Sequence, residues 1–563
     1  MGPWNLLALP LIVALLAPAA CGRNEAGAHG LEARIKSLFD AMRPSPSPDE
    51  VSEALARQLR TAPAPGAFPT RETLKDFYER RSHRLVWCDE SGKLLPRTTT
   101  LLEALRRAGE HGLNPADYSL DRLDALGSAI GSKKISRLAD FDLLVTATFF
   151  RYASDVSTGR VHPDEVREDW HTNPPEIDYV VMLAQALEKD ELPELLETLA
   201  PPHRGYAVLR EALRGLRTVA AAGGWPAIPD GPRIAPGSRG PRVVLLRQRL
   251  AFEPGNPPAG GSDTYDRALA ESVRRFEERH GIEPDGVVAG DALTELNEPV
   301  ETRIEEVELN LERWRWIPRS LGDPHVLVNI PGFELQLVQG GVPTWRTRVV
   351  TGKSYTPTPV FSDRIVGILV NPPWNVPESI AVGEYLPELR KNPKALERQH
   401  FRLLEGPGDD AREVDPRHVD WDHVDEAHFP YRIRQDPGPG NALGRVKFEL
   451  TNQFHIYLHD TPAGHLFSRS ERDLSHGCIR VEKPIELASR ILGAPAQEPL
   501  RDALDHAEER RFPVRPAVPV HILYWTAWVD EGGLRFGPDV YQLEGSQKAA
   551  LERAGARGER LGG

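Results

Sequence analysis

The chain has 563 residues, of which 40% are hydrophobic and 27% charged, and its net charge is −13 at pH 7. A chain of this length is expected to fold into roughly two to four domains, since a single hydrophobic core stops growing well below it. The acidic balance argues against a nucleic-acid-binding protein, which needs a basic footprint, and it gives no general attraction to an anionic membrane.

The N-terminus is predicted to be a targeting segment. An apolar run from Leu6 to Ala20 ends in two alanines directly before Cys21. The run fits a signal peptide and is too short and too interrupted by proline to span a membrane. Alanine-alanine-cysteine is similar to a bacterial lipoprotein cleavage site, in which Cys21 is acylated, although Pro18 departs from that pattern. Lipidation at Cys21 and a simple secretory signal over residues 1–21 both stay open.

The next three segments contain no predicted catalytic residues. Prolines punctuate residues 22–68, which predicts a semi-rigid tether with a short helix at 51–60. Apolar residues recur at helical spacing over 69–230, so a helical domain is expected, and a second such set predicts a compact helical unit over 235–300. A lone cysteine is most often a small buried apolar residue, which is the interpretation for Cys88.

From about residue 301 the pattern changes to β. Alternating apolar residues predict a mostly β sandwich or barrel over 301–545, with a helix at 485–492. The charged, Gly- and Pro-rich stretch 386–446 indicates an irregular insertion, and so long an insertion is typical of a functional lid. Residues 546–563 are predicted to be a flexible tail. The expected strands lie at 325–330, 332–338, 345–351, 365–371, 454–459 and 520–529.

The most informative motif joins Ser475, His476, Gly477 and Cys478, with His459 nineteen residues before the cysteine. A free thiol has a pKa near ~8.5, so it attacks poorly at neutral pH unless an imidazole takes its proton. Glycine lets the backbone amides at 477 and 478 approach a developing oxyanion. The motif therefore predicts an acyl-transferring enzyme with Cys478 as its nucleophile.

Two other interpretations use the same residues. His455, His459, His476 and Cys478 are residue types that zinc accepts, although structural zinc sites favour close pairs of cysteines. Cys478 as an inert core residue is the second alternative. With only three cysteines in the chain, the nucleophile is favoured, and no metal or cofactor is expected.

Residues 456–462 together with 475–481 resemble the L,D-transpeptidase family and its YkuD-type catalytic domain. The resemblance covers most of the chain, from about residue 66 to about residue 545. Five further stretches are similar to the large periplasmic branch of this family, at 310–316, 328–333, 349–353, 371–377 and 524–528.

The resemblance implies a multidomain α+β chain. Phe276 and Glu277 stand where the usual peptidoglycan-binding pattern has phenylalanine and glutamine, so the fold is better supported than binding, and a purely structural role stays open. The implied domains are a helical scaffold domain at 69–230, a three-helix peptidoglycan-binding-like domain at 235–300, and a mostly β catalytic domain at 301–545 with a capping insertion at 386–446.

The resemblance also implies the reaction, which is 3→3 cross-linking of peptidoglycan, a part of cell-wall organisation and cell shape. Cys478 is expected to form a thioester with a tetrapeptide donor stem, releasing D-alanine, and a second stem resolves it. His459 is the expected base, oriented by a backbone carbonyl instead of the Asp460 side chain, and His476 assists. Water as acceptor, a lipoprotein lysine as acceptor, and a non-catalytic cell-wall binding protein are the alternatives.

Several residues are expected to bind substrate. Arg480 is expected to grip a carboxylate with its planar fork, with a structural salt bridge as the alternative. Tyr457 lies two residues before His459 and so on the same strand face. Ser475 is expected to fix the turn and to contact substrate. Weaker pocket candidates are Trp374 and Asn375.

The expected partners are peptidoglycan stem peptides and cell-wall synthesis proteins that contact the scaffold domain. No nucleic acid is expected. The expected location is the periplasm, with anchoring at the outer membrane if Cys21 is lipidated.

Overall fold

The computed structural model describes residues 46–61, 69–130, 134–256, 260–397, 400–406 and 411–562, with side chains up to residue 555. The expected signal segment, Cys21 and much of the tether lie outside this part of the chain. The described residues form two compact units, the first built from those within 46–61, 70–100 and 119–148, and the second from the rest. Of the helices described, none has the length and apolarity that crossing a bilayer requires.

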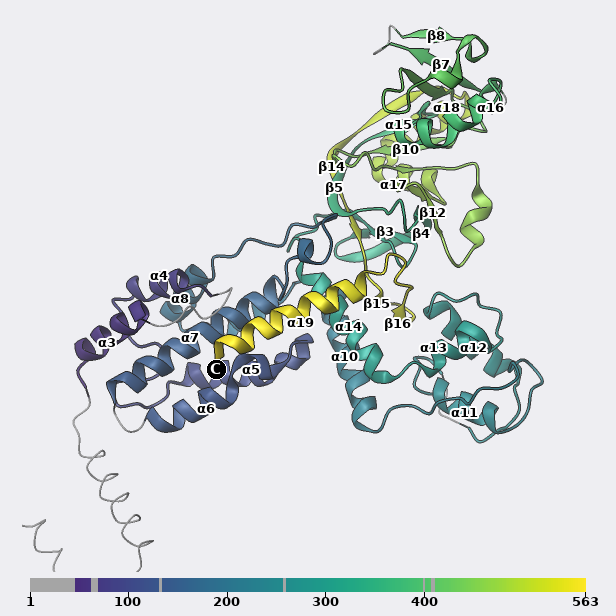
Figure 1. Cartoon of the computed structure of the whole chain (residues 1–563). Coiled ribbons are helices and arrows are strands. Elements are labelled where there is room, and N and C mark those ends of the chain that lie inside the picture. The colour runs from purple at the N-terminus through teal and green to yellow at the C-terminus, as the bar shows by residue number, and fades with distance from the viewer. Residues whose placement is uncertain are drawn as a thin grey trace, which may run out of the picture. The chain divides into compact units, whose positions relative to one another are not determined.

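The first unit is helical, as expected, and the short helix expected in the tether is α3. A buried carboxylate organises its core: Asp142 accepts hydrogen bonds from the Tyr78 hydroxyl at 2.7 Å and from the Trp87 amide at 2.8 Å. Burial raises the pKa of Asp142 to about 6. Cys88 is buried beside it. The helices are α3 (Pro48–Thr61), α4 (Arg71–Glu79), α6 (Leu120–Ala129) and the first parts of α5 (Pro96–Arg106) and α7 (Ile135–Ser157) (Figure 1).

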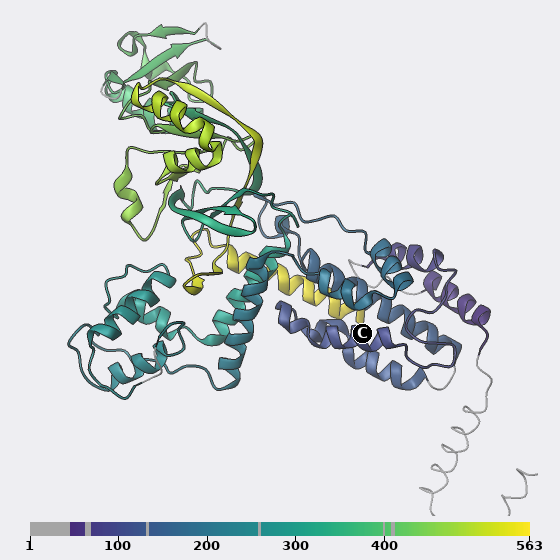
Figure 2. The ribbon, with the colours of Figure 1, turned by 180° about the vertical axis from the view of Figure 1, so that it is seen from behind.

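The second unit begins with helices and ends with strands. The expectation that the β pattern starts near 301 is wrong, because α14 (Val300–Arg315) comes first. Its apolar residues repeat at helical spacing and pack on α10, so that the two helices lie side by side in Figures 1 and 2. The helical elements before it are η1 (Ala108–His111), η2 (Pro115–Tyr118), η4 (Pro163–Glu165), α8 (Tyr179–Lys189), α9 (Leu192–Thr198) and α10 (Arg204–Ala221).

A three-helix module lies between α10 and α14 and has its own core, which includes Val243, Leu269 and Phe276. Glu277, which replaces the usual glutamine, is buried and accepts a hydrogen bond from the Gly286 amide at 2.8 Å. Burial raises the pKa of Glu277 to about 7. The side chain therefore holds the turn at Gly286, which supports a structural role for this position. The helices are α11 (Pro241–Leu250), α12 (Arg267–Arg279) and α13 (Gly290–Asn297).

A closed β-barrel forms the centre of the catalytic region. β14 pairs with β2 on one side and with β5 on the other, so the sheet closes on itself and its apolar side chains form one core. The multidomain fold class with a mostly β C-terminal part is thus confirmed. The strands, in order around the barrel, are β5 (Val360–Val370), β10 (Val446–Glu449), β11 (Leu458–His459), β13 (Ile479–Val481), β4 (Val342–Gly352), β3 (Glu334–Gln339), β2 (His325–Asn329) and β14 (Arg510–Leu523).

Smaller elements complete the barrel. β1 pairs with β5, and β12 pairs with β4 beside the motif that contains Cys478. The strand expected at 520–529 is interrupted, because β14 ends at Leu523 and a separate hairpin begins at Ala527. These elements are β1 (Trp170–His171), β12 (Asp473–Ser475), β15 (Ala527–Asp530), β16 (Gly533–Phe536), η9 (Gly464–Ser468), η10 (Ala494–Ala496), α17 (Pro484–Leu492) and α18 (Gln497–Asp505).

The insertion is not irregular, which corrects the interpretation of 386–446. Residues 374–435 form a folded cap with a sheet of its own, in the order β6-β9-β7-β8. Leu386, Phe401, Trp421 and Ile433 bury against one another in its core. Each cap element is too short to show a period in the sequence. The elements are β6 (Trp374–Asn375), α15 (Glu378–Ile380), η5 (Ala381–Tyr385), α16 (Leu386–Lys391), β7 (Phe401–Glu405), β8 (Arg412–Val414), η7 (Pro416–His418), η8 (Trp421–His423) and β9 (Tyr431–Gln435).

The C-terminal segment was expected to be a flexible tail, and this prediction is wrong. It forms the helix α19 (Leu543–Gly562). Its Gln547 is fully buried and bridges α14, donating to the Leu309 carbonyl at 2.9 Å and accepting from Arg313 Nε at 2.8 Å. The Asp539 carboxylate caps the helix by accepting from the Leu543 amide at 2.9 Å.

Candidate active site

Strand register brings the predicted residues onto one face. β11 pairs in parallel with β13, with Leu458 opposite Ile479 and His459 opposite Arg480. Leu458 and Ile479 are fully buried in the barrel core. Because side chains alternate along a strand, His459 and Arg480 point to the other face, as do the residues two positions away, Tyr457 and Cys478. These four residues, which come from two separate segments of the chain, therefore share one face.

Hydrogen bonds fix Cys478 in the turn at 475–478, here called the nucleophile turn after its predicted role. The Ser475 hydroxyl donates to the Cys478 carbonyl at 2.6 Å and accepts from the Gly477 amide at 3.2 Å. Gly477 has φ +106°, a conformation that side chains disfavour. Ser475 thus fixes the turn, as expected.

A second layer supports the turn from β4. The Thr358 hydroxyl donates to the Gly477 carbonyl at 2.7 Å and accepts from the Gly352 amide at 2.9 Å. A Cβ on Gly352 would lie only 2.9 Å from the Gly477 Cα. The Tyr541 hydroxyl donates to the Gly352 carbonyl at 2.8 Å. Gly352, Thr358 and Tyr541 therefore shape the site, and sequence reasoning did not identify them.

Of the two amides expected to bind an oxyanion, one is already engaged in a hydrogen bond. The Cys478 amide has no hydrogen-bond acceptor among the described residues. The Gly477 amide, also expected to serve, is already bonded to the Ser475 hydroxyl. The Cys478 amide is the better oxyanion donor of the two.

His459 is held as a neutral imidazole. It is 5% exposed, and its Nδ1 lies 2.5 Å from the Asp460 carbonyl, the orienting contact that was expected. The Asp460 carboxylate instead accepts from the Arg445 and Thr461 amides at 2.8 and 2.7 Å. Burial, with the nearby Arg480 guanidinium, lowers the pKa of His459 to about 3. With Nδ1 donating to the carbonyl, Nε2 keeps a lone pair that can take a proton.

The thiol of Cys478 experiences opposing influences. Burial raises its pKa, while hydrogen bonds from Tyr457 and the charges of Lys447 and Arg480 lower it. The Cys478 sulfur also lies 3.8 Å from the His455 carbonyl, to which its thiol donates. Burial also raises the pKa of the Tyr457 hydroxyl, and the adjacent sulfur adds to this effect. Tyr457 therefore lies against the nucleophile, on the face where it was expected.

Lys447 is a functional candidate that sequence reasoning missed. It lies on β10 opposite His459, and its Nζ is 4.2 Å from the centroid of the Tyr457 ring. No salt bridge to Lys447 occurs in the described part of the chain, and burial lowers its pKa. β10 was not among the predicted strands, so nothing in the sequence indicated which face Lys447 occupies.

Arg480 has no carboxylate partner among the described residues, so the structural salt bridge considered as its alternative is not formed there. Its Nε is buried and makes no hydrogen bond. Burial lowers the pKa of Arg480. A half-buried guanidinium without a counter-ion is costly, so this position favours an anionic ligand.

His476 contacts the cap. Its Nε2 lies 2.6 Å from Oε1 of Glu384, on η5. This contact engages one ring nitrogen of His476, and its assistance to Cys478 stays a prediction. The pair joins the nucleophile turn to the cap, and Glu384 was not identified from the sequence because it lies 92 residues away.

The two weaker pocket candidates separate. The Trp374 side chain packs 6.0 Å from the Phe401 ring in the cap core, and a hydrogen bond from it lowers the pKa of Tyr457. Trp374 thus connects the cap to the active-site face. Asn375 is exposed, and its backbone pairs with that of Arg434 on β9. This pairing connects it to the cap sheet and to none of the other predicted site residues.

The zinc interpretation has no support in the geometry. Among the residues that the structure describes, no group of three or more His, Cys, Asp or Glu side chains is arranged to hold a metal ion.

Comparisons with known proteins agree with the geometry. A model of the Scaffold domain matches residues 72–213, and a model of the L,D-transpeptidase catalytic domain matches residues 323–522. A protein of Haemophilus influenzae, provisionally named an L,D-transpeptidase, is 36% identical over 241 residues. That match covers 42% of this chain and 47% of the relative, so the chain matches about half of the relative's length.

Crystal structures of two L,D-transpeptidases are also similar. The protein from Xylanimonas cellulosilytica is 14% identical, with 52% of this chain and 99% of that chain covered, at a TM-score of 0.17. The protein from Stackebrandtia nassauensis is 12% identical, with 53% and 96% covered, at a TM-score of 0.22. At these TM-scores the two structures add no support of their own.

Proposed function

This chain carries the catalytic domain of the L,D-transpeptidases, and we propose that it forms 3→3 cross-links between peptidoglycan stems through a thioester on Cys478. The observation that carries the proposal is the shared face of β11 and β13, which holds Cys478, His459 and Arg480 together. A nucleophile, a base and a carboxylate-binding cation are the groups that this acyl transfer requires.

The first step acylates the enzyme. Nε2 of His459 takes the thiol proton as the Cys478 sulfur attacks the carbonyl of the third donor-stem residue. The Cys478 amide donates to the oxyanion. The carbon–nitrogen bond to D-alanine then breaks, the imidazolium returns its proton to the leaving amine, and a thioester remains.

The second step transfers the acyl group. The side-chain amine of diaminopimelate in a second stem attacks the thioester carbonyl and loses a proton to His459. The carbon–sulfur bond breaks, and the thiolate recovers the proton from the imidazolium. A new amide joins the third residues of the two stems.

Two cations support both steps. Arg480 binds a stem carboxylate and fixes the donor carbonyl near the sulfur, since a planar fork matches carboxylate geometry. Lys447 and Arg480 also lower the pKa of Cys478, which favours the thiolate that must attack and later leave. The aromatic ring of Tyr457 holds Lys447 in position.

The test uses the chain without residues 1–21, disaccharide-tetrapeptide fragments, and mass spectrometry of the products. We expect cross-linked dimers and free D-alanine, both abolished in Cys478→Ala and retained in the matched control Cys88→Ala. Release of tripeptide without dimers would assign an L,D-carboxypeptidase instead. Dimers that persist in Cys478→Ala would overturn the assigned nucleophile.

The location of the reaction is a separate proposal. Peptidoglycan lies outside the cytoplasm, and Cys21 follows an apolar run that ends in small residues, so we place the protein in the periplasm with a lipid on Cys21. Metabolic labelling with palmitate tests this: label is expected in the full chain and absent from Cys21→Ser. Export without label would assign a simple secretory signal.

A further inference from the structure

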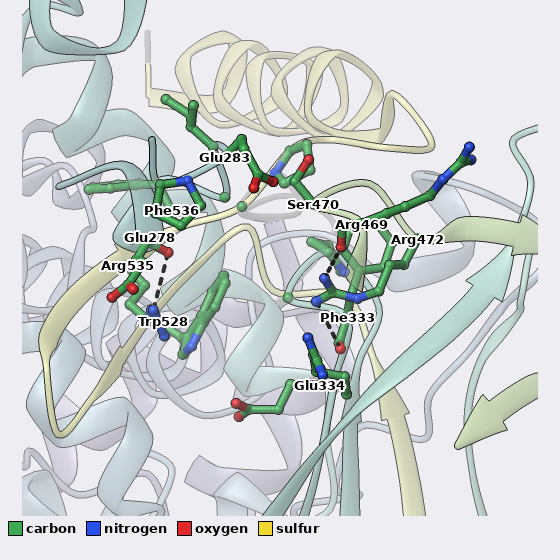
Figure 3. A pocket seen from close by; sticks show the side chains of 18 of the residues that line it. Glu278, Glu283, Phe333, Glu334, Arg469, Ser470, Arg472, Trp528, Arg535 and Phe536 are labelled. Carbon is green, nitrogen blue, oxygen red and sulfur yellow. Dashed lines mark hydrogen bonds between the residues drawn. The ribbon is translucent and has the colours of Figure 1, made fainter. Parts of the chain in front are cut away.

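A cavity of about 330 Å³ lies where the three-helix module meets the catalytic barrel (Figure 3). Its size is at the lower end of the range for small-ligand sites. It is lined by Glu278 and Glu283 from the module, and by Phe333, Arg469, Arg472 and Trp528 from the barrel. None of these residues belongs to the site around Cys478.

Direct contacts hold the two walls together. Arg535 donates to the Glu278 carbonyl at 3.1 Å. The rings of His280, at the end of α12, and Phe536, on β16, stack at 5.5 Å. The cavity is therefore a fixed part of this unit.

The barrel wall carries two cations that lack an anion. Neither Arg469 nor Arg472 forms an ion pair in the described part of the chain. Arg472 lies 5.2 Å from the centroid of the Phe333 ring, and its buried Nε has no hydrogen-bond partner. Its two terminal nitrogens donate to the Arg469 carbonyl and, at 3.4 Å, to the Phe333 carbonyl. Burial lowers the pKa of Arg472 to about 10. The neighbouring Arg348 and Arg535, in contrast, are paired with Glu482 and Asp530.

The module wall carries the opposite charge. Glu278 and Glu283 are exposed and form no ion pair within the described ranges. Glu334, on β3 of the barrel wall, also lines the cavity; it accepts from Gln336 Nε2 at 2.5 Å, and burial raises its pKa. Figure 3 shows Arg472 opposite Glu278 and Glu283, with Arg469 on the same side as Arg472 and its side chain extending outward. Such a site fits a ligand with a carboxylate at one end and an amine at the other.

Strand β4 connects the cavity to the turn that contains Cys478. Arg348 on β4 lines it, and Gly352, four residues further along the same strand, supports the nucleophile turn. Four strand residues span about 13 Å. Arg472 also directly precedes β12, which leads into that turn.

We infer that this cavity holds a non-reacting stem peptide of the peptidoglycan by its free amine and its carboxylates. Glu278 and Glu283 bind the diaminopimelate amine, and Arg469 and Arg472 bind the carboxylates. Holding one stem raises the local concentration of the next stem at Cys478 without a new contact there. The inference rests on the proposed function for the identity of the peptide.

The binding test uses the full mature chain with Cys478→Ala, which cannot turn over, and the probe L-alanyl-γ-D-glutamyl-meso-diaminopimelate in calorimetry. Arg469→Gln and Glu283→Gln are each expected to weaken binding about five-fold, the upper range for an exposed charge. Acetylating the diaminopimelate side-chain amine of the probe should remove the effect of Glu283→Gln on binding. Matched controls are Arg267→Gln and Glu188→Gln, exposed residues outside the cavity.

Three results would overturn the inference: no binding of the tripeptide, binding unchanged by both cavity variants, or equal sensitivity when the probe is the disaccharide without peptide. A second measurement uses active enzyme. The cavity variants should keep the wild-type rate on monomeric disaccharide-tetrapeptide while co-sedimenting less with isolated sacculi. Since binding to Cys478→Ala needs no catalysis, its failure is distinguishable from failure of the proposed reaction.

Discussion

Buried charges occur both on α14 and on the active-site face, but they are paired with an opposite charge only on α14. On α14, Arg315 and Glu312 are 1% and 2% exposed and lie 2.5 Å apart. Glu312 also accepts from the Val161 amide at 3.2 Å. On the active-site face, Lys447 and Arg480 have no carboxylate partner among the described residues.

The difference separates structural charge from functional charge. A buried pair whose hydrogen bonds are met contributes to a defined fold, and removal of either partner leaves a costly isolated charge. A partly buried cation with no anion lowers the free energy of unfolding, and the rest of the fold must offset that cost. Such perturbed groups concentrate at functional sites. Breaking each kind of charge should therefore affect different measurements.

The largest effect on stability is expected from Glu312→Gln. The variant leaves the Arg315 guanidinium buried without its counter-ion, which should lower the free energy of unfolding by about 3–5 kcal/mol. Chemical denaturation measures this. The control is Glu405→Gln, which breaks an exposed pair with Arg412 and should cost no more than about 1 kcal/mol. Equal costs for the two variants would contradict the comparison.

The largest effect on activity without a loss of fold is expected from His459→Gln. Loss of the base should slow acylation of Cys478 by about 10²–10⁴-fold, measured by intact mass after mixing with donor. Retained acylation would reassign the base.

His459 also predicts a pH effect on stability. Its folded pKa of about 3 is below its ordinary 6.5, so between these values the unfolded chain binds a proton that the folded chain does not. Relative to His459→Gln, the wild type should therefore lose stability as pH falls from about 6.5 and level off near pH 3. If the free energy of unfolding depends on pH in the same way for the two proteins, the pKa of His459 is not lowered in the folded chain.

A smaller effect is expected from Arg480→Gln. Loss of a charged hydrogen bond to the substrate carboxylate should lower kcat/KM roughly 30-fold, about 2 kcal/mol, and Arg480→Lys should recover part of it. The melting temperature should not fall, because no ion pair is broken. A lower melting temperature with unchanged kcat/KM would make Arg480 a structural residue.

The smallest effect is expected from Lys447→Gln. Removing this cation should raise the pKa of Cys478, so that alkylation by iodoacetamide at pH 7 slows roughly two- to five-fold, as for the loss of up to about 1 kcal/mol of charge interaction. The control is Lys391→Gln, exposed on the cap. A pH profile of alkylation identical to the wild type would exclude Lys447 from tuning the thiol.

Much of the fold and the centre of the site could be predicted because their signals are local. Helical and alternating periods depend on residues a few positions apart, which is why the three-helix module and the main barrel strands were found. Cys478, Gly477 and Ser475 lie in one turn, and the shared face of Tyr457 and His459 follows from their spacing of two. The cap was recognised as an insertion but not as a folded unit, since its core joins short elements.

The sequence by itself predicted Cys478 as the nucleophile from residue chemistry and local spacing, and its resemblance to a known family implied His459 as the base and the multidomain fold class. Only the tertiary structure decided that Lys447 lies opposite His459, that His476 binds Glu384, and that the C-terminal helix supports α14 through Gln547. These contacts depend on strand register and on packing between segments up to 238 residues apart. Each contact forms only after the intervening chain has folded so that its two distant partners meet, and no local sequence pattern encodes this.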